Sequence, residues 1–191
     1  LEYSNYVKRI QLVPKIINIE KIIYENNLIK LTYKYYNPHK NKIEIFTRQI
    51  PLNLKLNNEF MYFFGLWCGD RYRVGISNSC IELLKFTSNF LKNNLKQKES
   101  SILGEVLSSY ELTKSEWECH NRILRNIGAV KLRNRIYSKK RGKKIVNYAI
   151  LLSNNYILWH ILKSLEINLD NLFSIIGEEQ RFAFYAGFFD A

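Results

Sequence analysis

Hydrophobic and polar positions divide the chain into a β-rich beginning and a mixed remainder. Two strand-like runs, Leu28–Tyr36 and Ile43–Ile50, are joined by residues 37–41, which have good turn-forming chemistry. From residue 57 onward, apolar side chains at helical spacing alternate with short extended runs. The pattern predicts an α+β fold in which residues 1–56 form a small β-rich accessory module.

Start and stop signals place the elements that follow residue 56. Helices are expected from about Glu59 to Gly69, after the capping boxes Ser79–Glu82 and Thr113–Glu116, from Ser153 or Asn154 through Leu165, and from Glu178 to the end. Extended segments are expected at Arg71–Ile76, at 101–112 and, paired as a hairpin, at Val130–Tyr137 and Ile145–Leu152. Helices interleaved with short antiparallel strands should therefore follow the accessory module.

Small residues recur at every fourth position in two of these helices. The earlier helix carries Gly65 and Gly69, and the last helix carries Ala183, Gly187 and Ala191. Glycine costs about 1 kcal/mol relative to alanine in a helix interior, so its recurrence indicates a packing requirement. Either helix taken singly fits an ordinary core helix with chance glycines. Taken as a pair, the two stripes predict that the helix backbones approach each other closely.

The same two helices carry a shared motif. Residues 63–70 (Phe-Phe-Gly-Leu-Trp-Cys-Gly-Asp) and, 122 residues later, residues 185–191 (Tyr-Ala-Gly-Phe-Phe-Asp-Ala) resemble the signature of the LAGLIDADG homing endonucleases. The resemblance implies a pseudo-symmetric protein with the two signature helices at its centre and a curved antiparallel sheet in each repeat. It implies a first repeat over residues 57–182 and the start of a second over 183–191, with the C-terminal half of the same parent chain as an expected partner.

The resemblance also implies a nuclease site at Asp70. In this family each signature helix presents an acid from its C-terminal end, and divalent metal assists hydrolysis of one phosphodiester bond per strand. A carboxylate at the negative end of a helix dipole becomes favourable beside a cation, and the free helix carbonyls add oxygen ligands. Asp70 and Gly69 are therefore the expected ligands of Mg²⁺. The second acid would be residue 192, because Asp190 matches an earlier position of the motif that is usually structural.

The charge of the chain indicates a polyanionic partner. Basic residues outnumber acidic ones by 29 to 17, a net charge of +12, and a surplus of this size attracts nucleic acid. In the extended run after residue 130, a period of two puts Lys131, Arg133 and Arg135 on one strand face, which suits a DNA groove. Arg71 and Arg73 share a strand face in the same way. The turn after residue 137 adds further candidate DNA contacts: Lys139, Lys140, Arg141, Lys143 and Lys144.

These patterns predict a magnesium-dependent enzyme that cuts double-stranded DNA at a specific site, with the 191-residue chain not competent by itself. Three departures from the family pattern leave alternatives open. Arg71 replaces the usual last glycine, Ser79 stands where many relatives carry a lysine, and the stretch before Ser77 is short for a DNA-reading hairpin. One alternative is a catalytically decayed nucleic-acid-binding module, such as an RNA maturase or a DNA-binding regulator. The other is a basic α+β interaction domain with no nucleic-acid role.

Cysteine usage and apolar run length bear on location. Cys68, Cys80 and Cys119 form an odd, scattered set, which is typical of reduced thiols inside a cell. The longest apolar run, Phe60–Cys68, is too short for a membrane span, and the chain does not open on a signal-peptide pattern. We expect an intracellular protein, cytoplasmic or nucleoid-associated, that has no membrane partner.

Overall fold

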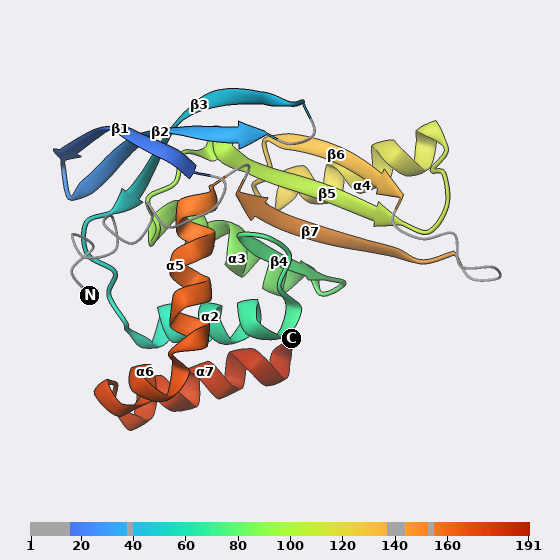
Figure 1. Ribbon diagram of the computed structural model, residues 1–191. Coiled ribbons are helices and arrows are strands. Elements are labelled where there is room, and N and C mark those ends of the chain that lie inside the picture. The colour runs from blue at the N-terminus through green and yellow to red at the C-terminus, as the bar shows by residue number, and fades with distance from the viewer. Residues whose placement is uncertain (1–15, 38–39, 137–143, 153–154) are drawn as a thin grey trace. The chain divides into compact units, whose positions relative to one another are not determined.

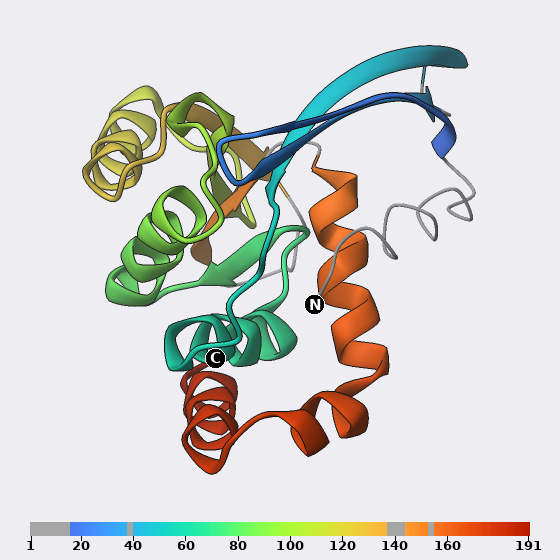
Figure 2. The same cartoon turned by 90° about the vertical axis from the view of Figure 1, so that its left-hand side faces the viewer.

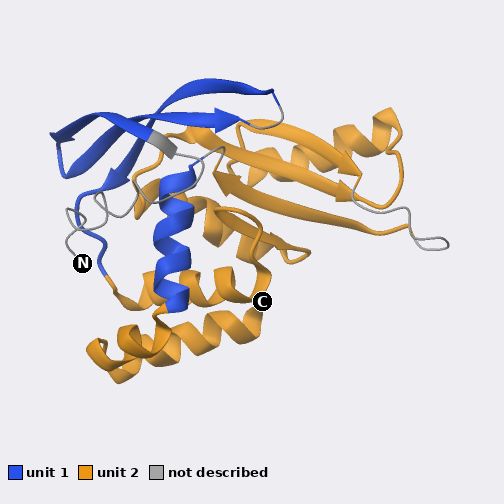
Figure 3. Cartoon of the chain, viewed as in Figure 1, with its two compact units in different colours: residues 1–55, 155–167 blue, residues 56–154, 168–191 orange. Residues whose placement is uncertain are grey.

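The computed structural model describes residues 16–37, 40–136, 144–152 and 155–191, and the chain forms two compact units (Figure 3). The first unit contains residues 1–55 and 155–167, and the second contains residues 56–154 and 168–191. The boundary predicted at residue 56 thus lies within one residue of the division. Residues 155–167, by contrast, belong with the N-terminal module and not with the repeat predicted over 57–182.

In the residues that the structure describes, the first unit is an antiparallel three-stranded sheet with one helix (Figure 1). Its elements are β1 (Ile16–Glu25), β2 (Leu28–Asn37), β3 (Lys42–Pro51) and α5 (Tyr156–Ile167). The two predicted strands are confirmed, and β1 is a third strand in a segment predicted only to be β-rich. Asn26 and Asn27 join β1 to β2 with φ angles of +50° and +60°, the conformation that a two-residue hairpin turn requires.

The alternating pattern of β2 determines which of its faces is buried. Ile29, Leu31 and Tyr33 are fully buried, whereas the side chains between them are only half-buried. Tyr35 continues the buried series and stacks on Tyr156 of α5, with ring centroids 4.6 Å apart. One apolar face of the sheet and the first turn of α5 therefore form the core of this unit.

A side-chain cap begins α5. The side-chain oxygen of Asn155 accepts a hydrogen bond of 3.2 Å from the backbone nitrogen of Leu158, which satisfies one of the free amides of the first turn. The predicted caps, Ser153 and Asn154, lie outside the described residues. The observed cap, Asn155, is one or two residues later in the chain than the predicted ones.

The second unit combines helices with a four-stranded sheet (Figure 1). In chain order its elements are α2 (Asn58–Asp70), β4 (Gly75–Asn78), α3 (Ile81–Asn93), a short 3₁₀ turn (Glu99–Ser101), β5 (Ile102–Ser108), α4 (Lys114–Asn126), β6 (Lys131–Ile136), β7 (Val146–Leu152), α6 (Leu169–Ile175) and α7 (Glu178–Asp190). Across the sheet the strand order is β4-β7-β5-β6. The α+β class is as predicted, and α6 is a helix that the sequence pattern did not indicate.

The hairpin predicted between Val130–Tyr137 and Ile145–Leu152 is wrong. Strand β5 lies between β6 and β7, pairing antiparallel with β7 and parallel with β6. The sheet is therefore mixed and not purely antiparallel. The reason lies in α4, because a helix between two strands supplies the long crossover that a parallel pair needs.

The strand predicted over Arg71–Ile76 forms only at its last two residues, because β4 begins at Gly75. Arg71 makes a single antiparallel bridge to Ile76, and the backbone nitrogen of Tyr72 donates to the carbonyl of Gly75 at 3.0 Å, so a tight turn connects α2 to β4. Arg73 has a φ of +57°, which is incompatible with an extended run. Arg71 and Arg73 consequently do not share a strand face.

Of the two predicted capping boxes, one is confirmed and one is wrong. The side chains of Thr113 and Glu116 each bond the backbone of the other at the start of α4. At α3 the residue before the helix is Cys80, which makes no side-chain cap, and its backbone nitrogen donates to the side chain of Asn78 at 2.7 Å. Ser79 therefore does not cap the helix.

One face of the second sheet packs on helices. A Cβ atom added to Gly104 of β5 would lie against Leu124 of α4 and Ala129, and Tyr148 of β7 bonds His120 of α4 at 2.8 Å. Gly128, with a φ of +92°, ends α4 as its sequence position predicts. The opposite face of the sheet carries a buried apolar cluster, with Tyr72 packed against it: Leu103, Leu107, Ala149 and Leu151.

Candidate functional site

Helices α2 and α7 pack against each other along their small residues (Figures 1 and 2). A Cβ atom added to Gly65 would lie less than 3.0 Å from the backbone of Phe184, and one added to Gly187 would lie as close to the backbone of Tyr62. The same 122 residues separate Gly65 from Gly187 and Tyr62 from Phe184. The contact is therefore reciprocal, and a local twofold relation connects the two helices. Ala183, one turn before Gly187, is half-buried.

The C-terminal ends of the two helices also meet. A Cβ atom added to Gly69 would lie less than 3.0 Å from the side chain of Ala191, which places Asp70 beside the end of α7. Asn78, the last residue of β4, donates its side-chain amide to the Asp70 carboxylate. The same amide lies 3.5 Å from the carbonyl oxygen of Ala191. A carboxylate, an amide and main-chain carbonyl oxygens thus converge where α2 and α7 end.

The surroundings of Asp70 favour a cation. Burial raises the pKa of the Asp70 carboxyl, and the hydrogen bond from Asn78 partly opposes this rise. Two helix C-termini converge here, and each contributes partial negative charge. Burial and the two helix ends both disfavour the ionised carboxylate. A positive ion beside it would offset both and lower its free energy.

A magnesium ion at this place would take few ligands from the protein and most from water. Magnesium is commonly held by one or two carboxylates and keeps several waters. Within the described ranges, no group of three or more His, Cys, Asp or Glu side chains is placed to hold a metal. Asp70 would supply the one carboxylate, while Gly69 and Ala191 have only main-chain carbonyls to offer.

Asp190 has a different environment from Asp70. It accepts a hydrogen bond of 2.6 Å from the hydroxyl of Tyr62, so this carboxylate joins α7 to α2. Burial, and then the contact with Asp190, raises the pKa of Tyr62 to about 12. The geometry agrees with the structural role expected from the motif position of Asp190.

Three predicted DNA-contacting cations lie together at the edge of the second sheet. Lys131, Arg133 and Arg135 of β6 are exposed and pair in register with residues 103, 105 and 107 of β5. Alternate residues of a strand point to one side, so the three cations lie on the face opposite α3 and α4. We call this surface the basic sheet face.

A buried acid lies beneath the basic sheet face. Glu105 is fully buried, and one of its carboxylate oxygens lies 3.5 Å from the guanidinium of Arg133. The other oxygen accepts a hydrogen bond of 2.6 Å from the hydroxyl of Tyr72, which itself accepts one of 3.0 Å from Arg135. Burial and the bond to Glu105 raise the pKa of Tyr72, and the bond to Tyr72 raises the pKa of Arg135. These partners compensate a charge that would be costly to bury alone.

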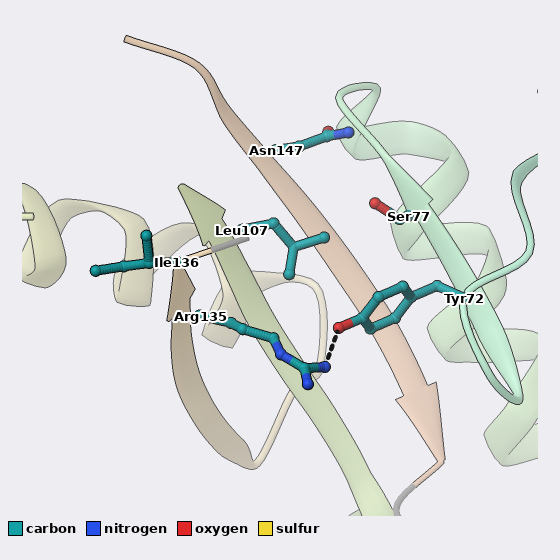
Figure 4. Close-up of a pocket in the computed structure, with 6 residues that line it drawn as sticks. All are labelled: Tyr72, Ser77, Leu107, Arg135, Ile136 and Asn147. Carbon is teal, nitrogen blue, oxygen red and sulfur yellow. Dashed lines mark hydrogen bonds between the residues drawn. The ribbon is translucent and has the colours of Figure 1, made fainter. Parts of the chain in front are cut away.

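A cavity of about 560 Å³ opens beside this network (Figure 4). Leu107 contributes apolar surface in its middle, and the bonded pair of Arg135 and Tyr72 forms one side. The remaining lining residues are Ser77, Ile136 and Asn147. An apolar surface with a few converging polar groups is the usual composition of a ligand pocket.

The other predicted DNA contacts are placed differently. The guanidinium of Arg71 lies 5.0 Å from the ring centre of Trp67, and that of Arg73 lies 5.8 Å from the ring centre of Tyr72. The ammonium of Lys144 lies 4.8 Å from the ring centre of Tyr110. The predicted contacts that lie outside the described residues are Lys139, Lys140, Arg141 and Lys143.

Three residues of the site were not among those predicted: Tyr72, Asn78 and Glu105. For Glu105 the sequence contains a usable signal, because it is the single charged residue within the apolar run 102–107. A lone acid in such a run is either exposed on a strand face or buried with a partner. Tyr72 and Asn78 give no comparable signal, since each stands among residues whose pattern does not reveal its partners: Tyr72 bonds Glu105, 33 positions away, and Asn78 reaches Asp70 across a turn.

Comparison of the chain with protein-family models, with curated proteins and with solved structures gave no match. In the part of the chain that the structure describes, no helix has both the length and the apolar character needed to cross a membrane. The geometry of α2, α7 and the basic sheet face is therefore the basis on which a function is inferred.

Proposed function

We propose that this chain belongs to a homing endonuclease of the LAGLIDADG type, which binds double-stranded DNA and hydrolyses its phosphodiester bonds with a divalent metal. The observation that carries the proposal is the reciprocal packing of α2 and α7. Two matching helices, 122 residues apart, meet through glycines so closely that their ends converge at Asp70. If these were two unrelated core helices with chance glycines, there would be no reason for each glycine to meet the backbone of the other helix at equivalent positions.

In the proposed reaction, basic residues of this chain bind DNA, and one acidic residue binds the metal. The basic sheet face, with Lys131, Arg133 and Arg135, would lie along one side of the duplex, where its positive charge attracts the phosphates. Asp70 would hold a magnesium ion, which on binding supplies Lewis-acid activation of water and stabilises the departing oxygen. Asn78 orients the Asp70 carboxylate through its amide.

A catalytically decayed binding module is the second candidate, and the contact with Asn78 favours it. An amide that donates to the Asp70 carboxylate takes up acceptor capacity that a metal would otherwise use. The tight turn at residues 71–76 also removes the arginine-bearing strand that was predicted next to Asp70. Such a module would bind DNA or RNA through the same basic sheet face without cutting it.

Duplex binding is tested with fluorescently labelled DNA at a series of salt concentrations. Replacing Lys131, Arg133 and Arg135 by glutamine should weaken binding and reduce the slope of log affinity against log salt by about three charges. A matched triple variant changes Lys85, Lys92 and Lys98, which are exposed on α3 and the segment after it. Equal losses in the two triple variants would contradict the placement of DNA on the basic sheet face.

Cleavage separates the two candidate functions. The resemblance assigns the second acid to the residue after Ala191, so the assay uses a chain that includes this residue. Asp70→Asn should abolish magnesium-dependent cutting and retain duplex binding, because it removes the charge that holds the metal while keeping the side-chain shape. A parental chain that binds DNA but never cuts it would favour the decayed module.

A further inference from the structure

Of the three cations on the basic sheet face, Arg135 is the one that lines the cavity (Figure 4). One of its guanidinium nitrogens donates to the Tyr72 hydroxyl at 3.0 Å. Arginine carries five N–H donors in a planar fork, so most of them remain available after this bond. Lys131 is a flexible point charge, and Arg133 is drawn toward Glu105 at 3.5 Å.

The position of Arg135 depends on two residues behind it. Tyr72 packs on the apolar cluster of the sheet and donates to the buried Glu105 at 2.6 Å. Because Glu105 is fully buried, water does not compete for this bond. The phenol oxygen is thereby fixed, and it presents an acceptor that holds the guanidinium at the side of the cavity. A guanidinium fixed in advance loses less rotamer freedom on binding.

Two side chains that line the cavity, Arg135 and Asn147, carry hydrogen-bond donors, and the hydroxyl of Ser77 can donate or accept. Besides Arg135, the cavity is lined by Asn147, whose side-chain oxygen already accepts a bond of 3.1 Å from the backbone nitrogen of Tyr148. The amide hydrogens of Asn147 add two further donors at the cavity. A donor-rich pocket matches a base edge that offers acceptors, and in the major groove guanine offers two, O6 and N7.

We propose that Arg135 reads a guanine in the major groove and that Tyr72 and Glu105 are the positioning residues that hold it for this task. The inference rests on the proposed DNA binding and adds to it a base preference and the residues that set it. Lys131 and Arg133 then contact phosphates and contribute affinity without base discrimination. Neither Tyr72 nor Glu105 needs to touch DNA.

The test selects bound duplexes from a random-sequence library and then measures the affinity for the selected site and for its single-base variants. The wild-type chain should prefer guanine at one position by about tenfold or more, the discrimination expected of a bidentate arginine. Arg135→Lys keeps the charge but loses the fork, so it should lose most of this preference and retain its affinity for unrelated DNA. Arg133→Lys, two residues away on the same strand, is the matched control and should keep the preference.

Two further variants test the positioning residues without changing Arg135. Tyr72→Phe removes only the hydroxyl, so the guanine preference should fall several-fold while affinity for unrelated DNA stays the same. Glu105→Gln removes one negative charge beneath the face, so affinity for unrelated DNA should rise while the guanine preference falls. A merely structural defect would lower the guanine preference and the affinity for unrelated DNA together. Thermal unfolding identifies any variant that fails to fold, in which case the other variant decides.

The outcomes separate this inference from the proposed function. A wild-type chain that does not bind duplex DNA at low salt overturns the proposed function. One that binds without any base preference, or whose preference is lost equally in Arg133→Lys and Arg135→Lys, overturns only the role of Arg135. Retention of the guanine preference in both Tyr72→Phe and Glu105→Gln overturns the positioning role.

Discussion

Helices α2 and α7 have equivalent inner faces and very different outer faces. Gly65 and Gly187 occupy the same place in the contact, each against the backbone of the other helix. Trp67 of α2 is fully buried, whereas Phe189, the residue 122 positions later, is 81% exposed. The same contrast holds for the other outer aromatics: Phe60 and Phe63 are buried, and their counterparts Phe182 and Tyr185 are exposed at 65% and 46%.

The difference between the outer faces comes from the neighbours of each helix. Phe63 stacks on Phe90 of α3 with ring centroids 4.3 Å apart, and the indole nitrogen of Trp67 donates to the carbonyl of Arg73 at 2.7 Å. On α7, the nearest comparable partner is Phe173 of α6, which contacts Phe184 and Tyr185 edge-on. A signature helix therefore specifies its contact with the other signature helix, while burial of its outer face depends on elements supplied elsewhere.

The largest expected effect tests the outer faces. Trp67→Ala should lower the free energy of unfolding by about 3–5 kcal/mol, because it leaves a cavity in a closed core. Phe189→Ala, the equivalent change on α7, should alter it by no more than about 0.5 kcal/mol, because that side chain is exposed. Chemical denaturation of both variants measures the difference. Similar losses would show that the outer face of α7 is buried in solution.

The next effect tests the inner faces. Gly65→Ala and Gly187→Ala should each destabilise the protein by about 1–3 kcal/mol, because the new methyl group meets the backbone of the other helix. Reciprocal geometry predicts that the two losses are similar. Gly177→Ala is the control, since a Cβ atom there meets only the side chain of Gln180, which can move. Tolerance of alanine at Gly65 would contradict the close approach of the helices.

A smaller effect tests where the twofold relation breaks down. Tyr62 donates to Asp190, but the counterpart of Tyr62 on the opposite helix is Phe184, whose side chain has no hydroxyl to donate. Tyr62→Phe should cost about 1 kcal/mol, the usual contribution of a partly exposed hydrogen bond. A double-mutant cycle with Asp190→Ala, which removes the acceptor, measures the coupling, and an energy near zero would mean that the pair does not connect the helices.

The smallest effect concerns the acid at the end of α2. Because the pKa of Asp70 is raised in the folded state, ionisation of this carboxyl opposes folding above that pKa. Asp70→Asn should therefore stabilise the metal-free protein at pH 7 by a few tenths of a kcal/mol to about 1 kcal/mol. The gain should disappear below the ordinary pKa of 3.8, where the carboxyl is neutral in both states.

Magnesium should make the wild-type chain more stable than Asp70→Asn, the reverse of the order expected without metal. Added Mg²⁺ should raise the unfolding temperature of the wild-type chain and leave that of Asp70→Asn unchanged, because ligand binding stabilises only the folded state that holds it. Asp190→Asn is the matched change on α7 and should respond to Mg²⁺ like the wild type. An equal response of all three chains would remove Asp70 as the metal-binding acid.

Local pattern was sufficient for many of the elements. Helical spacing predicted α2, the capping box at Thr113 predicted α4, and the strand-like run Leu28–Tyr36 predicted β2. The turn at 71–76 escaped prediction because alternating residue types there mimic a strand, whereas Arg73 adopts a positive φ. The cap predicted at Ser79 does not form, because the side chain of Asn78 accepts from the backbone nitrogen of Cys80 instead.

The sequence by itself determined that two glycine-bearing helices should meet and that three cations should share one strand face. Both follow from spacing within a single element, where backbone geometry fixes which residues are neighbours. Only the tertiary structure decided that β5 separates β6 from β7, and that Glu105 lies beneath Arg133 and within reach of Tyr72. Those contacts join residues 28 and 33 positions apart. Their formation depends on strand order, which no local period encodes.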